Sequence, residues 1–379
     1  MKFGLSFLPD AAPDDKSASD YYRDALDMSV LADAAGLSTI KITEHYGMAY
    51  GGYCPDPLMF LVAVAQKTRQ VRLMTGCLLP TFHHPVQLAS RIAMADVLTN
   101  GRLDVGFARA FLPAEFDMLG IDLDESHARF DATVAAITDL LTHEVASAKT
   151  PFFSYQDVHL LPLPVQRPHP PLWAAAARSR SSFARAGERG LNLLTAFTIQ
   201  SDQHLNEQIA IYQEARQDAG HAGRGRVTML IPLFVHTDDR VARERGLAYL
   251  RRYHTTWADA STGWRNRSSR AYPGYTDLHR QLEALSAQDV FENGSLVFGD
   301  PERVRDHISR LTETFDIDQI LWNVDFGAMG REDAMSSLSL FLEKCLDHND
   351  KTDHATIRSE AERREAQNGR LLRSTRHMT

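Results

Sequence analysis

The chain has 379 residues, of which 44% are hydrophobic, and its 41 Lys and Arg against 49 Asp and Glu give a formal charge of −8. This length can bury one large α/β core or two medium ones, and the acidic balance argues against a nucleic-acid protein that works through a general basic surface. The three cysteines have no metal-ligand spacing, and no apolar run approaches the ~18 residues of a membrane span. We therefore expect a cytoplasmic protein with small-molecule partners and no nucleic-acid or membrane partner.

Short apolar runs alternate with amphipathic segments along the chain. Strands are predicted at 3–7, 39–43, 71–79, 103–108, 172–176, 192–196, 227–235 and 319–324. Helices are predicted at 21–35, 58–65, 85–98, 129–141, 181–189, 203–219, 242–253 and 332–345. Eight strands, each followed by a helix, predict a (β/α)8 TIM barrel. An open doubly wound sheet is the alternative, but its dinucleotide fingerprint is missing, since the nearest match at 220–225 follows a helix and precedes a strand.

Two insertions interrupt this alternation, one after the fourth strand and one after the seventh. The first, at 151–171, is rich in proline and predicts a loop or small insertion. The second, at 257–293, carries Trp and Tyr side chains without periodicity and is predicted to be a lid or disordered. We expect one barrel domain at 1–348 and a polar tail at 349–379 that is frayed or disordered.

A charged pair, Glu44 and His45, follows the second predicted strand directly. In parallel α/β proteins, polar side chains at the carboxyl ends of strands face the crevice where chemistry occurs. His45 is therefore a candidate functional residue, and Glu44 either orients it or caps the strand end. A metal site formed by His45 with His83 and His84 is not expected, because adjacent histidines point apart and no carboxylate follows at ligand spacing.

The segment at 177–182, Ala-Arg-Ser-Arg-Ser-Ser, follows the fifth predicted strand and opens a helix. It offers backbone N–H groups, hydroxyls and two guanidinium groups, which together stabilise a dianion such as a phosphate. An ordinary solvated helix start is the alternative interpretation.

Several short motifs occur in the order and spacing of one known family. They are Met-Lys-Phe-Gly at 1–4, the Glu-His pair at 44–45, Leu-Pro-Thr-Phe-His-His-Pro at 79–85, Asn-Gly-Arg at 100–102, Gly-Phe-Ala-Arg at 106–109 and Gly-Asp-Pro-Glu-Arg-Val at 299–304. Further matches lie at 323–327 and 337–341. Over residues 1–346 the chain resembles the bacterial luciferase-like flavin-dependent monooxygenases.

This resemblance implies a (β/α)8 barrel on which reduced FMN reacts with O2 to form a C4a-hydroperoxide that oxidises a hydrophobic organic molecule. His45 falls on the family's active-site histidine, which implies a role as acid or base, and Arg109 falls on the arginine that pairs with the flavin phosphate. The phosphate-binding loop falls on Ala177, Arg178, Ser179 and Ser181, where Ala177 replaces the common acidic residue, so the side-chain contacts are expected to differ. The bond between Thr75 and Gly76 falls where the family often has a non-prolyl cis peptide under the flavin ring.

The resemblance also bears on partners. Because the chain has no nicotinamide fingerprint, a separate reductase is expected to supply the reduced flavin. A homodimer is expected through the apolar helices at 58–65 and 85–98, although ordinary barrel packing explains the same pattern. Two other functions stay open: hydride transfer with the deazaflavin F420, and a non-catalytic luciferase-like partner subunit.

Overall fold

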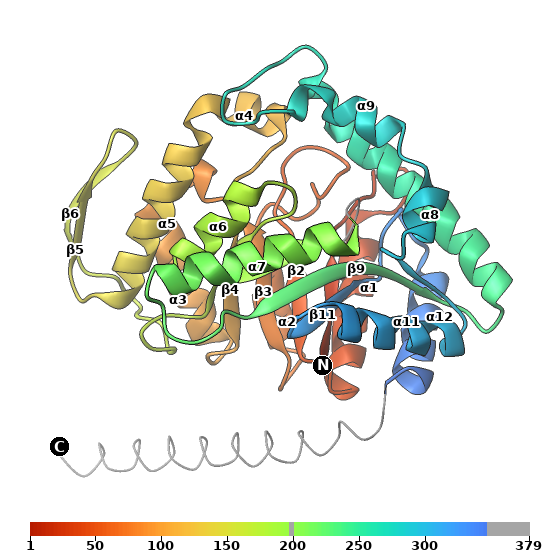
Figure 1. The fold of residues 1–379 in the computed structure, drawn as a ribbon. Helices are drawn as coiled ribbons and strands as arrows, with labels where there is room; N and C mark the ends of the chain where they lie inside the picture. Colours follow the sequence, from red (N-terminus) through yellow and green to blue (C-terminus); the bar gives the residue numbers. More distant parts are fainter. Residues whose placement is uncertain (197–200, 347–379) are drawn as a thin grey trace, which may run out of the picture.

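The structure, a computed structural model, describes residues 1–196 and 201–346 (Figure 1). Its eight-stranded parallel barrel consists of β1 (Lys2–Phe7), β2 (Thr39–Ile42), β3 (Arg72–Leu78), β4 (Leu103–Phe107), β7 (Leu172–Ala175), β8 (Asn192–Ala196), β9 (Val227–Val235) and β11 (Gln319–Asn323). β1 pairs with β2 and β11, and β9 pairs with β8 and β11, so the sheet closes on itself. The predicted barrel and all eight predicted strands are confirmed. The predicted tail at 349–379 and the domain boundary at 348 lie outside the described residues.

Helices surround the barrel and begin at capping residues that the sequence supplies. They are α1 (Ala18–Ala34), α2 (Pro57–Ala65), α3 (Pro85–Leu98), α5 (Ser126–Thr142), α6 (Arg180–Glu188), α7 (Asp202–Asp218), α8 (Asp239–Ala260), α11 (Pro301–Thr314) and α12 (Arg331–Lys344). Asp56 and Asp300 cap α2 and α11, each of which starts with proline, the residue best tolerated in a first turn. None of the described helices is long and apolar enough to cross a membrane.

The strands divide the apolar side chains between two regions. Residues such as Leu5 and Ile42 belong to the large core shared with the surrounding helices. A second cluster, Met74, Cys77, Trp173, Leu194 and Leu321, fills the barrel interior, as alternation along barrel strands requires. With its interior packed, the barrel can place a site only at its ends.

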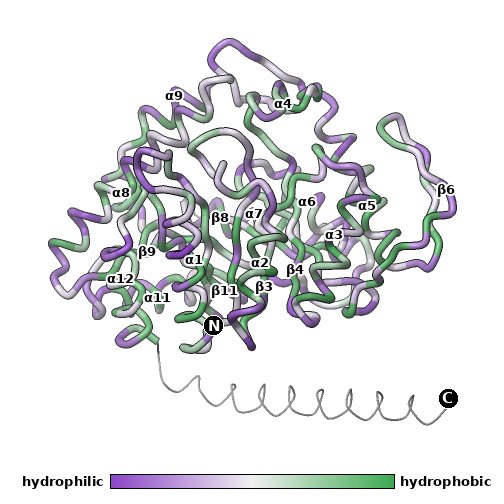
Figure 2. The backbone as a smooth tube through the Cα atoms, turned by 180° about the vertical axis from the view of Figure 1, so that it is seen from behind, coloured by the Kyte–Doolittle hydropathy of each residue, from purple (hydrophilic) through white to green (hydrophobic). Residues whose placement is uncertain are grey.

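Besides α5, two segments lie between β4 and β7. The first is α4 (Pro113–Leu119), which the sequence did not predict, followed by a 3-10 turn, η2 (Leu123–Glu125). The second follows α5 and is an antiparallel hairpin of β5 (Ala146–Lys149) and β6 (Ser154–Val158), which confirms the predicted small insertion. Figures 1 and 2 both show this hairpin standing away from the barrel.

The insertion after the seventh strand is an ordered lid rather than a disordered loop. α8 begins after its cap Asp238 and runs to Ala260, past the predicted end at 253, because no glycine or proline interrupts its last three turns. The chain continues through η3 (Thr262–Trp264), η4 (Tyr275–Asp277), α9 (Leu278–Glu283), α10 (Ala287–Glu292) and the short strand β10 (Val297–Gly299), which pairs with β9. We call residues 257–283 the lid.

The lid is fixed to the loop that follows β4. Trp264 Nε1 donates to Phe111 O (3.0 Å), and the Tyr272 hydroxyl donates to Ala110 O (2.5 Å). The buried cluster that forms there also includes Leu79, from the loop after β3. The lid therefore lies over the carboxyl ends of these strands, and Figure 1 shows both α4 and α9 at the top of the view.

Candidate active site

His45 follows β2 and is hydrogen-bonded to an acid that the sequence did not single out. Its Nδ1 lies 2.9 Å from Oε1 of Glu115, on α4. Both side chains are buried, with Glu115 fully excluded from solvent. Glu115 Oε2 is also buried and has no hydrogen-bond partner among the described residues. This pair forms a polar centre within an apolar surrounding.

The hydrogen bonds of Glu115 fix which ring nitrogen of His45 is free. The backbone N–H of Tyr46 also donates to Oε1 of Glu115 (3.1 Å), so this oxygen acts as an acceptor. With a carboxylate as acceptor, Nδ1 of His45 carries its hydrogen and Nε2 presents a lone pair. His45 is thus arranged to take a proton at Nε2 and to return it.

Aromatic side chains surround the His45 ring. The ring of Tyr50 lies 5.1 Å from it, and that of Phe111 lies 6.3 Å away, edge-on. Tyr50 in turn stacks on Trp257 of α8 (6.1 Å, 14°). Gly51 adopts φ +78°, and a Cβ there would come within 2.5 Å of the His45 ring, so the approach of this loop requires glycine. The histidine is therefore held rigidly against an apolar wall.

Glu44, the other predicted catalytic residue, does not contact His45. It accepts hydrogen bonds from the Leu79 N–H (3.0 Å), from the Tyr46 hydroxyl and from His83 Nε2 (2.7 Å). Arg91, a donor only, lies 3.0 Å from Nδ1 of His83, so Nδ1 accepts and Nε2 donates to Glu44. The prediction that Glu44 orients His45 is wrong in its geometry: successive residues at a strand end point in opposite directions, and Glu44 instead joins the β2 and β3 ends.

Thr75 and Gly76 lie on β3, and the structure changes what was expected of both. The Thr75 hydroxyl donates to Gly106 O (3.0 Å) and accepts from Gly106 N–H (2.9 Å), so it is fully used in the barrel wall. The non-prolyl cis peptide lies between Gly76 and Cys77, one bond later than expected between Thr75 and Gly76. The register between β3 and β4 shifts at this point.

Arg109 follows β4 and belongs to a group of cations. Its Nη1 donates to Ser126 Oγ (3.2 Å) and to Ala271 O (2.8 Å), and its guanidinium lies 3.9 Å from the centre of the Tyr272 ring. Burial lowers the pKa of Arg109. His127 lies beside it and is bonded to Arg185 of α6 (2.7 Å). Burial, followed by the charges of Arg109 and Arg185, lowers the pKa of His127 to about 4.

The predicted phosphate loop lies on the same side of the barrel. Ser179 caps α6 and accepts from the Ser182 N–H (3.2 Å), while Arg178 donates to Gln281 of the lid (2.8 Å). Ser181 is exposed in the first turn, and Ala177 precedes the loop arginine. Tyr275 interacts electrostatically with both Arg178 and Arg109. Within the described chain, none of Arg109, Arg178 and Arg185 forms an ion pair with a carboxylate, so their charges are available to an anion.

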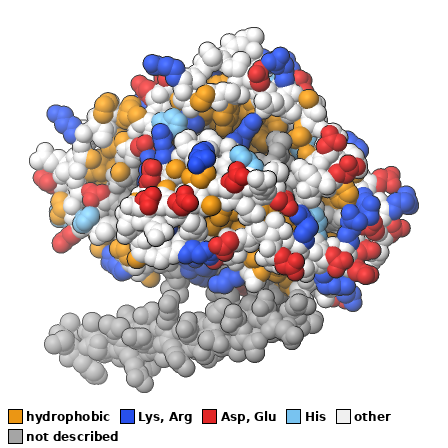
Figure 3. Space-filling view, in the orientation of Figure 1, with side chains coloured by type: hydrophobic (Ala, Val, Ile, Leu, Met, Phe, Trp, Pro, Cys, Tyr) orange, Lys and Arg blue, Asp and Glu red, His pale blue; other side chains and the backbone are white. Residues whose placement is uncertain are grey.

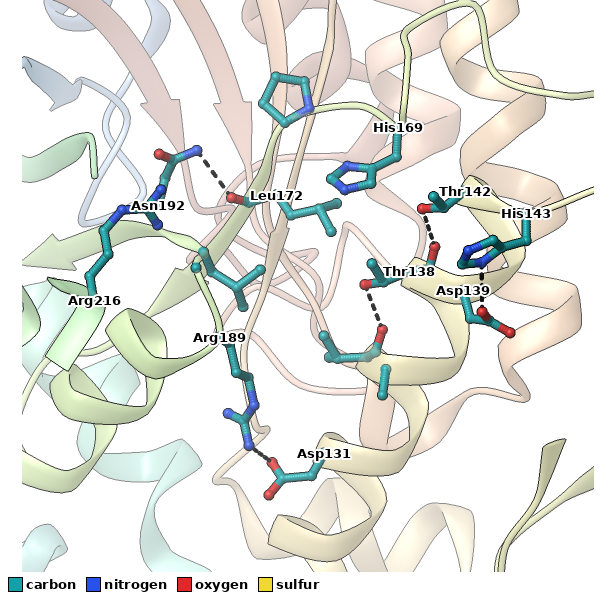
Figure 4. A pocket seen from close by; sticks show the side chains of 15 residues that line it. Asp131, Thr138, Asp139, Thr142, His143, His169, Leu172, Arg189, Asn192 and Arg216 are labelled. Carbon is teal, nitrogen blue, oxygen red and sulfur yellow. Dashed lines mark hydrogen bonds and ion pairs between the residues drawn. The ribbon is translucent and has the colours of Figure 1, made fainter. Parts of the chain in front are cut away.

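A cavity of about 730 Å³ lies elsewhere, between α5 and α6 at the amino ends of β7 and β8 (Figure 4). Its polar side chains are already paired: Arg189 with Asp131 (2.5 Å) and His143 with Asp139 (2.7 Å). It lies at the amino ends of the strands, whereas active sites of barrel enzymes lie at the carboxyl ends. We do not consider it a candidate for the active site.

Comparison with known proteins places the chain in a family. The family model described as luciferase-like monooxygenase matches residues 1–316. The chain belongs to the luciferase-like monooxygenases. The resemblance found in the sequence motifs is thereby confirmed.

Individual relatives of this luciferase-like monooxygenase are moderately similar. It is 27% identical over 245 residues to the oxygenase component of flavin-dependent trigonelline monooxygenase from Acinetobacter baylyi, covering 64% of this chain and 67% of that one. It is 27% identical over 320 residues to 4-hydroxyprotoasukamycin monooxygenase from Streptomyces nodosus subsp. asukaensis, covering 83% and 82%. The crystal structure of monooxygenase RslO1 from Streptomyces bottropensis superimposes with a TM-score of 0.81 at 34% identity, covering 92% of this chain and all of that one.

Sequence reasoning missed three residues of the candidate site: Glu115, His127 and Arg185. Glu115 lies on a helix of seven residues, which is too short for a periodic pattern, although the Pro113 start could have indicated it. Arg185 lies on a predicted helix and His127 lies two residues before the predicted start of another, but only the fold brings them to Arg109. In the described part of the chain, no group of three or more His, Cys, Asp or Glu is arranged to hold a metal ion.

Proposed function

We propose that this protein is the oxygenase of a two-component system that uses reduced FMN and O2 to oxidise a small hydrophobic organic molecule. One oxygen atom of O2 is added to the substrate and the other leaves as water, while the reduced flavin supplies two electrons and two protons. The relative from Acinetobacter baylyi is named as a flavin-dependent oxygenase component, which supports both the flavin and a separate reductase.

One observation carries this proposal: two different kinds of environment adjoin at the carboxyl end of the barrel. Arg109, Arg178 and Arg185 form a cationic side without carboxylate partners among the described residues. His45 and Glu115 form a buried acid–base pair among aromatic rings. Phe111 contacts the rings of both His45 and Tyr275 and so connects the two sides. A ligand with a charged phosphate and a flat, reactive ring matches this arrangement.

The cationic side fits the flavin phosphate. Guanidinium groups bind phosphate oxygens through paired N–H donors, and the start of α6 at Ser179 adds backbone N–H groups and the positive end of a helix. When bound, the flavin supplies the electrons and activates the oxygen. Arg109 and Arg178 also contact the lid, so phosphate binding and lid position are coupled through the same two side chains.

His45 and Glu115 provide the proton transfers of the proposed reaction. Nε2 of His45 can accept a proton from the substrate or donate one to the departing oxygen, and Glu115 stabilises the charged imidazole that results. Burial of both side chains under the lid excludes water from this step.

The aromatic wall indicates the class of substrate. Tyr50, Phe111 and Trp257 present ring surfaces beside His45, which suits a flat hydrophobic molecule. Trp257 Nε1 is buried without a partner among the described residues, and an indole N–H is a donor only. We propose that it donates to an oxygen of the substrate.

We also propose that the protein is a homodimer. α2 and α3 pack against each other. Together they expose four apolar side chains: Met59, Met94, Val97 and Leu98. Such a patch on adjacent helices is typical of a protein interface.

The deciding experiment is anaerobic titration of the purified protein with reduced FMN, followed by mixing with oxygenated buffer while the flavin spectrum is recorded. Tight binding, and a transient spectrum distinct from both free forms, would support the oxygenase. Binding of reduced F420 instead, without a reaction with oxygen, would support hydride transfer. Binding of neither cofactor would favour the non-catalytic partner subunit.

A further inference from the structure

Lys41 is a buried charge in the middle of β2. Its exposed fraction is 3%. A Cβ at Gly76 would come within 2.0–2.6 Å of Cε, Cγ and Cδ of Lys41, so the side chain crosses β3 at a position that has no side chain of its own. Its ammonium donates to Oγ1 of Thr43 (2.8 Å), two residues further along the strand. Lys41 therefore extends from the barrel interior toward the carboxyl end, below Glu44 and His45.

The ammonium has few partners there. The Thr43 hydroxyl donates its own hydrogen bond to Gly76 O (2.7 Å), so it is a neutral acceptor for Lys41. No carboxylate forms an ion pair with Lys41 in the described part of the chain. Asp325 interacts electrostatically with Lys41 without forming an ion pair, and it accepts a hydrogen bond from the Tyr21 hydroxyl (2.6 Å). An ammonium has three N–H donors, and Thr43 accepts one of them in the described structure.

This arrangement is costly for the fold alone. Burial lowers the pKa of Lys41 to about 8, so the protein holds a partly charged amine where an apolar side chain of the same length would pack without a desolvation cost. A buried cation with unused donors is suited to an anion that arrives with a ligand. The chain has such a ligand in the function proposed above, on which this inference rests.

We propose that the Lys41 ammonium stabilises the anionic, reduced form of the flavin ring bound at the carboxyl end of the barrel. Oxidised flavin is neutral in its ring, whereas the reduced ring readily loses a proton and carries negative charge. A cation close to the ring favours the reduced form and raises the midpoint potential of the bound flavin. Lys41 would thereby also make the protein select reduced flavin from the reductase over the oxidised form.

The test compares the affinities of oxidised and reduced FMN for the full chain and for Lys41→Met, which keeps the length of the side chain and removes its charge. We expect affinity for oxidised FMN to change less than threefold and affinity for reduced FMN to fall at least tenfold. For a two-electron couple, a tenfold change in this ratio lowers the midpoint potential by about 30 mV. The potential, measured with redox dyes, provides a second readout that needs no substrate.

Arg72→Met is the matched control, because it removes one positive charge from the amino end of the same barrel, where Arg72 pairs with Asp104 (2.6 Å). It should leave the ratio of the two affinities unchanged. If Lys41→Met does not fold, Lys41→Gln serves in its place. If the wild-type protein binds flavin and Lys41→Met loses affinity equally for oxidised and reduced FMN, or loses none, the role of Lys41 is overturned. Failure of the wild-type protein to bind either form would overturn the proposed function, and this inference with it.

Discussion

Oε1 of Glu115 lies 2.9 Å from Nδ1 of His45, although 70 residues separate them in the chain. The contact joins the end of β2 to α4, a helix inserted after β4. Since the Tyr46 N–H donates to the same oxygen, the acid holds both the tautomer and the orientation of the histidine. In the proposed function, the buried Glu115 is therefore the residue that orients His45 as a base.

Replacing Glu115 by Gln tests this relationship. The amide keeps an acceptor for the Tyr46 N–H but no longer carries the charge that supports a protonated His45. We expect the rate of substrate oxidation, measured after the complex with reduced FMN is mixed with O2 and substrate, to fall by about 10²-fold, the scale of one general acid–base group. His45→Ala should have an effect of similar size, and the double variant should be no worse than either single one, because the two residues act as a unit. Additive effects would contradict the pairing.

Replacing Arg109 by Met tests the phosphate site. The wild-type protein should bind FMN more tightly than riboflavin, which lacks the phosphate. The variant should lose about 10–100-fold of this preference, since a hydrogen bond to a charged group contributes roughly 1.5–3 kcal/mol. Fluorescence titration of both flavins measures the ratio. Arg251→Met, at an exposed position on α8, is the control, and an unchanged ratio in the Arg109 variant would remove Arg109 from the site.

Lys41→Met should stabilise the protein near pH 7. The pKa of Lys41 is lowered by burial from 10.5 to about 8, so between these values the unfolded chain binds more protons and stability rises with pH. Below pH 8 the charged amine therefore destabilises the fold by about 3 kcal/mol, and the variant should gain roughly that amount at pH 7. Urea unfolding at pH 7 and pH 10.5 measures the difference, which should shrink at the higher pH. A variant less stable than wild type at pH 7 would show that the contacts of Lys41 outweigh its burial.

His254 of α8 should make the protein sensitive to acid. Both of its ring nitrogens are buried without a partner among the described residues, and burial lowers the pKa of His254 from 6.5 to about 4. The unfolded chain binds its proton first as the pH falls, so stability is lost between pH 6.5 and pH 4. Between pH 7 and pH 5, the free energy of unfolding should fall by about 2 kcal/mol less in His254→Phe than in the wild-type protein. If the free energy of unfolding of the wild-type protein and of His254→Phe depends on pH in the same way, His254 is not the source of the acid sensitivity.

Met94→Glu tests the dimer. Met94 is 55% exposed on α3, and a charge there would be desolvated in an interface, so we expect dimer affinity to fall at least tenfold. Sedimentation over a range of concentrations measures it. Met118→Glu is the matched control, because Met118 is also 55% exposed but lies on α4. A wild-type protein that is monomeric at all concentrations would exclude the dimer.

The surface is consistent with the charge balance of the chain. Figure 3 shows acidic and basic side chains interspersed on the face in view, without a broad region of one sign among the described residues drawn there. The cations that matter for the proposed function lie instead in a small group under the lid, around Arg109 and Arg185.

The sequence by itself determined the barrel and the places where its strands end. Apolar strand runs and helix caps are local patterns, so the strand that precedes His45 and the one that precedes Arg109 could both be located from neighbouring residues alone. The tertiary structure decided which side chains meet there: Glu115 rather than Glu44 on His45, Arg185 and His127 beside Arg109, and Lys41 below the strand ends. These contacts join segments far apart in the chain, and their geometry depends on strand register, on the direction of successive side chains and on the path of the lid. No pattern among neighbouring residues records those relationships, because they arise only when the barrel closes.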